Sequence, residues 1–155
     1  TLSAAEAVRR RPRWGEGRRL LASLYLAWGL ERREAALVER AAAEFGAARA
    51  ANPNDALAAY GESEAVLVLG DRRRATVLAR EAVRLEPNFA RAWLLLSTLA
   101  AAEGDLAAAC SALEAARAAR QAAEGVVMIS GWERELVRWD AARASLVGSA
   151  CGGGL

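Results

Sequence analysis

The sequence contains no lysine and no histidine, so all twenty-one of its basic residues are arginine. Without histidine, the chain lacks the commonest general base and the commonest metal ligand. No nucleophile elbow, glycine-rich phosphate loop or cluster of metal-ligating residues stands in its place. We therefore expect no enzyme active site, no cofactor and no metal site within these residues.

Isoleucine and threonine are also scarce, with one isoleucine and three threonines among 155 residues. Forty residues are alanine and twenty-one are leucine, and with arginine and glutamate these are the strong helix formers. The composition predicts an all-α protein of one domain. The net charge is only +2, which argues against binding of polyanions through bulk charge.

The sequence gives little information on compartment. No charge-free stretch reaches membrane-spanning length, and the first residue is Thr1 rather than methionine, which suggests a piece of a longer protein or a processed one. A cytoplasmic location is the default expectation. Two cysteines cannot form a disulfide framework; we interpret Cys110 as a small buried apolar residue, and the surroundings of Cys151 do not match a lipidation signal.

Several features recur every 34 residues. Pro53 and Pro87 have this spacing, and the pairs Gly70-Asp71 and Gly104-Asp105 repeat it. The other series with the same period are Ala41, Ala75 and Ala109; Ala48, Ala82 and Ala116; Phe45, Ala79 and Leu113; Gly29, Ser63 and Ser97; and Tyr25, Ala59 and Trp93. Alanine matches alone would be weak in such a chain, but the glycine, aspartate and proline matches are not explained by composition.

The repeated pattern of large, small and glycine positions resembles the tetratricopeptide repeat (TPR), a pair of antiparallel helices. The three units span about 18–55, 56–89 and 90–123, and the third fits the pattern best. The second departs from it with Ala59 in place of an aromatic residue and Glu62 in place of a large apolar one. The resemblance implies a right-handed α-solenoid of three helix pairs that binds proteins and does not catalyse a reaction.

Glycine, aspartate and proline at the repeat boundaries predict where the helices begin and end. A glycine in left-handed conformation closes each first helix, an aspartate caps the second, and a proline stops it. The predicted helices span 18–30, 34–51, 55–69, 72–85, 89–103 and 106–121. The first helix can also be read in a register shifted by one turn, through Leu21, Leu24, Tyr25 and Trp28, which suggests an extra turn or a longer connection near Leu30–Glu34.

Segments outside the repeats complete the expected organisation. Residues 1–17 form a basic flank with a short helix over 3–11, and residues 124–147 contain a connector followed by an amphipathic helix over 131–147. That last helix either caps the stack or docks on another chain or on the stack's own groove. Residues 148–155 are predicted to be a disordered glycine-rich tail.

Four of the five tryptophans have a predicted packing role. Trp28 and Trp93 fall on repeat core positions, and Trp132 and Trp139 share one face of the last helix. Trp14, in an aperiodic segment, is the exception. Beside it lies the basic flank, Arg9, Arg10, Arg11 and Arg13, which is either a solvated terminus or a stretch that lies near a membrane surface or a phosphate-bearing partner.

In TPR domains, ligands commonly lie along the concave face of the first helix of each pair. Repeat spacing maps this groove to Leu57, Tyr60, Glu64, Leu67, Val68, Arg91, Leu94 and Thr98. The mostly apolar strip favours an amphipathic helix or an apolar peptide as ligand, and covering by the chain's own termini or a second copy is the alternative. TPR clamps for carboxylate tails use lysine and asparagine, and the chain has no lysine.

The leading hypothesis is a bacterial protein-interaction module that binds a protein or peptide and reads no nucleic-acid sequence. An alternative is a TPR appendage of a membrane enzyme. The irregular first repeat and the segment 130–136 are similar to the TPR extensions of bacterial O-antigen ligase-like polysaccharide enzymes.

Overall fold

The structure, a computed structural model, describes residues 3–10, 14–124 and 131–152. Over these residues the chain is helical, without strands, and it divides into two compact units, 1–81 and 82–155. None of the helices within the described ranges is long and apolar enough to cross a membrane. The all-α prediction is therefore confirmed.

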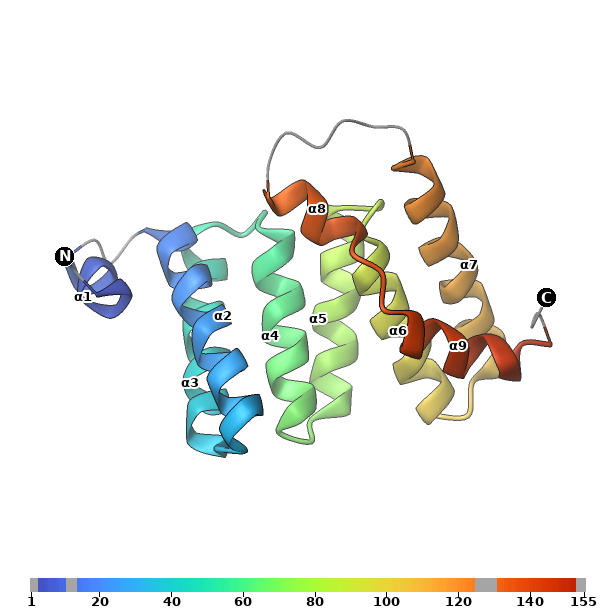
Figure 1. The fold of residues 1–155 in the computed structure, drawn as a ribbon, viewed down its shortest axis with the longest axis horizontal. Helices are drawn as coiled ribbons and strands as arrows, with labels where there is room; N and C mark the ends of the chain where they lie inside the picture. The colour runs from blue at the N-terminus through green and yellow to red at the C-terminus, as the bar shows by residue number, and fades with distance from the viewer. Residues whose placement is uncertain (1–2, 11–13, 125–130, 153–155) are drawn as a thin grey trace. The chain divides into compact units, whose positions relative to one another are not determined.

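The first unit is built from helices that pair in chain order (Figure 1). They are α1 (Ala4–Arg10), α2 (Gly15–Arg32), α3 (Ala35–Ala51), α4 (Ala56–Val68) and the greater part of α5 (Arg72–Leu85). α3 packs against both α2 and α4. Between α2, α3 and α4 lies a core of Ala22, Val38, Ala41, Phe45 and Ala65, in which the alanines let the helices approach closely.

The register of the first repeat follows from Gly29. A Cβ at this position would lie 2.7 Å from Cγ2 of Val38, so α2 and α3 can pack at this distance only with glycine there. Gly29 thus occupies the small position that Ser63 and Ser97 hold in the later repeats, and the register shifted by one turn is wrong. Of the two alternatives expected near Leu30–Glu34, the longer connection is wrong, because α2 ends at Arg32 and only Arg33 and Glu34 precede α3. α3 instead has an extra turn, since it begins at Ala35, three residues before the 34-residue equivalent of Arg72.

The second unit contains α6 (Ala90–Ala102) and α7 (Leu106–Ala122) as its repeat pair. Ser97 on α6 donates a hydrogen bond of 2.7 Å to the carbonyl of Ala109 on α7. In the first unit, Ser63 on α4 makes the equivalent 2.6 Å bond to Ala75 on α5. The small position of the repeat therefore holds a buried hydroxyl that joins the two helices of a pair.

The predicted roles of glycine, aspartate and proline at the helix ends are confirmed. Gly70 and Gly104 follow their helices with φ of +93° and +81°, in the left-handed region that glycine adopts without strain. The aspartates Asp71 and Asp105 accept backbone hydrogen bonds of 3.0 and 3.1 Å from the first turns of α5 and α7. α5 ends at Leu85, two residues before Pro87.

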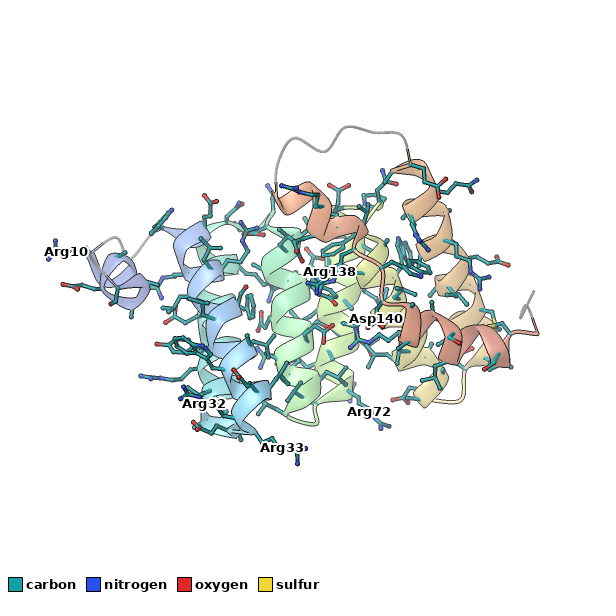
Figure 2. All side chains as sticks on the ribbon, in the orientation of Figure 1. Arg10, Arg32, Arg33, Arg72, Arg138 and Asp140 are labelled. Carbon is teal, nitrogen blue, oxygen red and sulfur yellow. A yellow bond between two sulfur atoms is a disulfide. The ribbon has the colours of Figure 1, made fainter. Side chains whose placement is uncertain are left out.

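The C-terminal part of the second unit differs from prediction. In place of one helix over 131–147 there are two, α8 (Gly131–Val137) and α9 (Ala141–Ala150), which the segment carrying Arg138 and Asp140 joins (Figure 2). The break coincides with Asp140, whose carboxylate accepts a hydrogen bond of 3.1 Å from Arg143 N and so begins a new helix.

The tail prediction also changes. Residues 148–150 belong to α9, and Cys151 forms a disulfide with Cys110 of α7, with a Cα–Cα distance of 5.7 Å. The interpretation of Cys110 as a free apolar residue is therefore wrong, because the pairing depends on α9 folding back onto α7. Disorder predicted from residue 148 is wrong as far as residue 152, and 153–155 lie outside the described residues.

Candidate functional site

The face of α6 that the groove prediction identified lies against α8 and α9 of the same unit. Arg91 donates to the Glu135 carboxylate of α8 at 2.5 Å. Leu94 is 1% exposed, in a cluster with Ala144 and Val147 of α9. Thr98, half-buried, donates to the carbonyl of Leu94 at 2.9 Å. Two of the predicted groove positions of the third repeat, Arg91 and Leu94, thus already contact the C-terminal helices of the chain itself, which lie over α6 in Figure 1.

Aromatic side chains border this contact. Trp93 and Trp139 are partly buried against the same cluster, as predicted for packing residues. Trp93 Nε1 donates to the carbonyl of Pro87 at 2.8 Å, and the guanidinium of Arg120 lies 4.6 Å from the centre of the Trp139 ring. A cation over an indole face is a favourable contact. The side chain of Trp132 lies outside the described residues.

The corresponding face of α4 carries the predicted residues of the second repeat. Leu57 and Leu67 are half-buried, and Val68 is 48% exposed. Tyr60 is buried, and its hydroxyl donates to Glu64 one turn further along the helix. On this face Tyr60 is therefore a buried residue whose hydroxyl is fixed by Glu64, while Leu57, Leu67 and Val68 provide apolar surface.

On another side of α4 lies a charged cluster that the groove prediction did not include. The Glu62 side chain is 2% exposed, and its two carboxylate oxygens accept hydrogen bonds of 2.7 Å, one from Arg49 and one from Arg74. The sequence signal for this cluster was present, because Glu62 occupies a position where the repeat usually has a large apolar residue.

The predicted basic flank is described only in part. Arg10 forms an exposed ion pair with Glu6 at 3.4 Å, and the side chains of Arg9, Arg11 and Arg13 lie outside the described residues. Two arginines at the start of α2 serve in ion pairs that hold the first unit together. Arg18 pairs with Glu44 of α3 at 2.9 Å.

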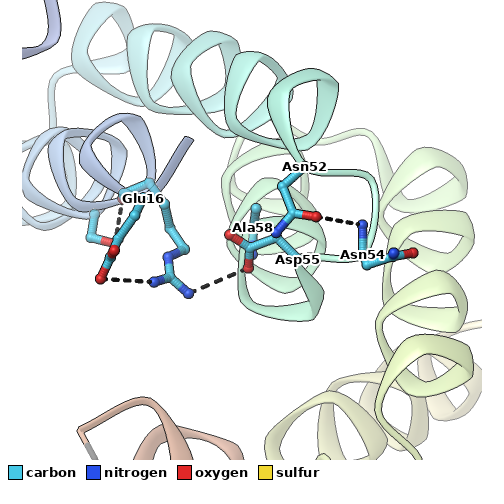
Figure 3. Close-up of polar contacts among 7 residues, drawn as sticks. Glu16, Asn52, Asn54, Asp55 and Ala58 are labelled. Atoms are coloured by element: carbon cyan, nitrogen blue, oxygen red, sulfur yellow. Dashed lines mark hydrogen bonds and ion pairs between the residues drawn. The ribbon is translucent and has the colours of Figure 1, made fainter. Parts of the chain in front are cut away.

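The second of these, Arg19, pairs with two acids from different parts of the first unit, Glu16 and Asp55, which are labelled in Figure 3. It lies 3.3 Å from the Asp55 carboxylate and 4.0 Å from that of Glu16. Asp55 also caps α4 by accepting from Ala58 N at 3.0 Å. Arg19 therefore fixes the beginning of α4 to α2 and is not part of a solvated basic surface.

Two tryptophans of the first unit lie at its surface. Trp28 is 42% exposed, so its predicted core position is wrong, although its equivalents in the later repeats, Glu62 and Leu96, are buried. Glu62 pairs with Arg49 of the preceding helix α3, whereas no repeat helix precedes α2 among the described residues. Trp14 is 38% exposed and its ring lies over Gly17 in the first turn of α2. Among residues 3–10, 14–124 and 131–152, no three metal-ligating side chains gather into a group that could hold an ion.

Paired antiparallel helices with a 34-residue period define a helical-repeat protein, and comparison with solved structures identifies the repeat. A thermophilic TPR protein of Thermus thermophilus is similar, with a TM-score of 0.66 and 25% identity over 79% of this chain and 63% of that one. This chain thus spans less than two thirds of the Thermus protein. MamA is similar over 96% of this chain and 86% of its own, with a TM-score of 0.66 and 19% identity.

The TPR2B domain of yeast Sti1, from a complex with pHsp70, matches with a TM-score of 0.63 and 24% identity over 85% of this chain and 96% of that domain. YrrB, described as a TPR protein with an unusual peptide-binding site, matches with a TM-score of 0.63 and 17% identity over 99% of this chain and 86% of its own. No protein-family model matches the sequence, and no curated protein is significantly similar to it. The chain has the TPR fold.

The comparisons lend no support to the second resemblance stated above, to the extensions of O-antigen ligase-like enzymes. An appendage of a membrane polysaccharide enzyme therefore stays a prediction from the sequence, as does membrane proximity of the basic flank.

Proposed function

We propose that this chain is a non-catalytic interaction module that binds an apolar peptide or amphipathic helix along the first helices of its repeats. The observation that carries the proposal is the packing on α6. There the chain's own α9 places Ala144 and Val147 against Leu94, and α8 places Glu135 on Arg91. Apolar side chains with one complementary charge are the features by which a groove holds an amphipathic helix.

Repeat spacing gives α4, in the first unit, a face of the same kind. Leu57, Tyr60 and Glu64 are the 34-residue equivalents of Arg91, Leu94 and Thr98, and Leu67 and Val68 complete the strip. On this helix the apolar surface comes from half-buried leucines and the exposed Val68. The names of two similar TPR structures, the Sti1 complex with pHsp70 and the YrrB peptide-binding site, support the same class of ligand.

A binding experiment with the chain's own helix tests whether the α6 face accepts a helical ligand. The receiver is the full chain with Val147→Asp, Cys110→Ser and Cys151→Ser, in which a buried aspartate and the lost disulfide weaken the docking of α9 in cis. The probe is a fluorescent peptide of residues 131–150. We expect this peptide to bind the receiver and to bind the wild-type chain far more weakly, because the tethered segment competes at high effective concentration.

The matched control is the same peptide with Val147→Asp, which should not bind. A receiver that remains folded by circular dichroism but binds neither peptide would overturn the proposal for the α6 face. For the α4 face, a photo-crosslinking residue at Val68 should capture a protein ligand that the same residue at Val77, 60% exposed on α5, does not capture. Equal capture at both positions would contradict the assignment.

A further inference from the structure

Helix α2 carries an apolar surface that the proposed groove does not use. Leu20, Leu24 and Trp28 follow one another at four-residue steps, and they are 55%, 42% and 42% exposed. Residues at this spacing form one continuous ridge along a helix. Three large apolar side chains in one exposed ridge are more than scattered surface residues explain, and such a patch marks an interaction site.

The residues beside the ridge suit close contact with another helix. Ser23 and Ala27 are small and exposed, so a second backbone can approach between the large side chains. The Ser23 hydroxyl donates to the carbonyl of Arg19 in its own helix at 3.0 Å. It therefore already has a hydrogen-bond partner and can be buried at little cost.

A ring contact with Tyr25 fixes the position of the Trp28 side chain. Its ring meets that of Tyr25 edge to face, with centroids 6.2 Å apart, and the guanidinium of Arg40 lies 5.4 Å from the Tyr25 ring centre. An ordered aromatic side chain loses little conformational entropy when a partner covers it, which is a property of residues that dominate interfaces.

Charges at the two ends of the ridge indicate which partner fits. Glu16 lies four residues before Leu20 with its side chain 68% exposed, and Arg32 lies four residues after Trp28 at the end of α2 (Figure 2). Along α2 the residues therefore follow the order acid, leucine, leucine, tryptophan, base. This order complements that of a second copy of α2 that runs in the opposite direction. If a twofold axis passes through Leu24, each copy's Leu20 meets the other's Trp28, and each Glu16 faces the other's Arg32.

We propose that this face of α2, formed by Leu20, Ser23, Leu24, Ala27 and Trp28, is a homodimer interface in which two copies of the chain pack their α2 helices antiparallel about Leu24. One surface patch used by both copies is the usual geometry of a symmetric dimer. A parallel arrangement would place Glu16 against Glu16 and Arg32 against Arg32, so the charges favour the antiparallel one. Four-residue ridges on both helices fit a crossing angle of about −50°.

The test measures the dissociation constant of the full-length, disulfide-bonded chain by sedimentation equilibrium. Leu24→Glu places two carboxylates together on the axis, and we expect it to weaken the dimer at least about tenfold. Val77→Glu, which adds the same charge at a more exposed apolar site on α5, should leave the dissociation constant unchanged. At concentrations low enough for every chain to be monomeric, the unfolding midpoints of both variants should match the wild type, because both sites are exposed.

Charge reversal tests the register. Glu16→Arg and Arg32→Glu should each weaken the dimer by about tenfold, because each creates two like-charged contacts, and the double variant should restore wild-type affinity. A chain that stays monomeric up to about 1 mM would overturn the proposal. Dimers that Leu24→Glu leaves intact, or that the double variant fails to restore, would overturn it as well and would point to another interface or another occupant of this face.

Discussion

The buried carboxylate of Glu62 gives the sharpest test of how this fold tolerates charge. Replacing it with glutamine keeps its size and removes its charge. The two hydrogen bonds to Arg49 and Arg74, both 2.7 Å long, then lose their ionic character, and one guanidinium must face the amide NH₂. Breaking a buried ion pair costs about 3–5 kcal/mol.

That cost is reduced here because both arginines reach water, with side chains 32% and 59% exposed. A guanidinium that loses its partner can be hydrated while its aliphatic stem stays on the surface. We therefore expect Glu62→Gln to lower the unfolding free energy of the first unit by about 2–3 kcal/mol.

Glu62→Leu should behave differently. The equivalent position of the next repeat is Leu96, 9% exposed, so leucine restores the apolar pattern of the repeat. Arg49 and Arg74 lose their carboxylate in this variant as well, but both reach water, and leucine leaves no amide without a partner in the core. We expect this variant to lie within about 1 kcal/mol of the wild type or above it.

Urea denaturation and native-state hydrogen exchange measure both variants, with α3 and α4 amides reporting on the site and α7 amides as internal reference. Glu39→Gln, an exposed change on α3, is the matched control and should have no effect. If Glu62→Leu destabilises the unit more than Glu62→Gln, or if Glu62→Gln costs less than about 0.5 kcal/mol, the ion pairs do not act as reasoned here.

Three further predictions concern the repeat and its end. Cys110→Ser with Cys151→Ser removes the disulfide that closes a loop of 41 residues, and urea denaturation should show that the second unit is less stable by about 2–4 kcal/mol. Hydrogen exchange in α9 should become faster, and unchanged exchange would contradict the prediction. Ser97→Ala removes a buried hydrogen bond and should lower the free energy of unfolding by about 1 kcal/mol, as measured by thermal unfolding. Ser97→Thr should lower it further, because its added methyl group must fit between α6 and α7. Gly70→Ala and Gly104→Ala should each cost about 1–2 kcal/mol in the same assay, and equal costs would confirm that the two turns are equivalent.

The period of 34 residues was readable because glycine, aspartate and proline act locally. Gly70 permits a left-handed turn, Asp71 caps the start of a helix and Pro87 restricts φ; each acts within one or two residues of itself, so its effect does not depend on the rest of the fold. The helix pairs and their boundaries followed from these positions with small errors at the ends.

Features that depend on packing partners could not be read in the same way. The register of α2 depends on Gly29 meeting Val38 across two helices, and hydrophobic periodicity alone allowed both registers. The exposure of Trp28 could not be read from the repeat either, because its equivalents Glu62 and Leu96 are buried. The Cys110–Cys151 disulfide required knowing that the last helix returns to α7. Covering of the groove by the chain's own terminus was one of the alternatives that the sequence left open, and only the structure shows that Ala144 and Val147 pack on Leu94.

The C-terminal helices show that capping the stack and covering its groove are one packing arrangement in this chain. α9 contacts both α6 and α7 but lies across them, whereas α4 runs alongside α3 (Figure 1). In this position α9 covers Leu94, and α8 brings Glu135 to Arg91. A ligand that displaces these helices must therefore also uncap the stack. Binding to the α6 face and stability of the second unit should accordingly change in opposite directions when the contact of α9 is weakened.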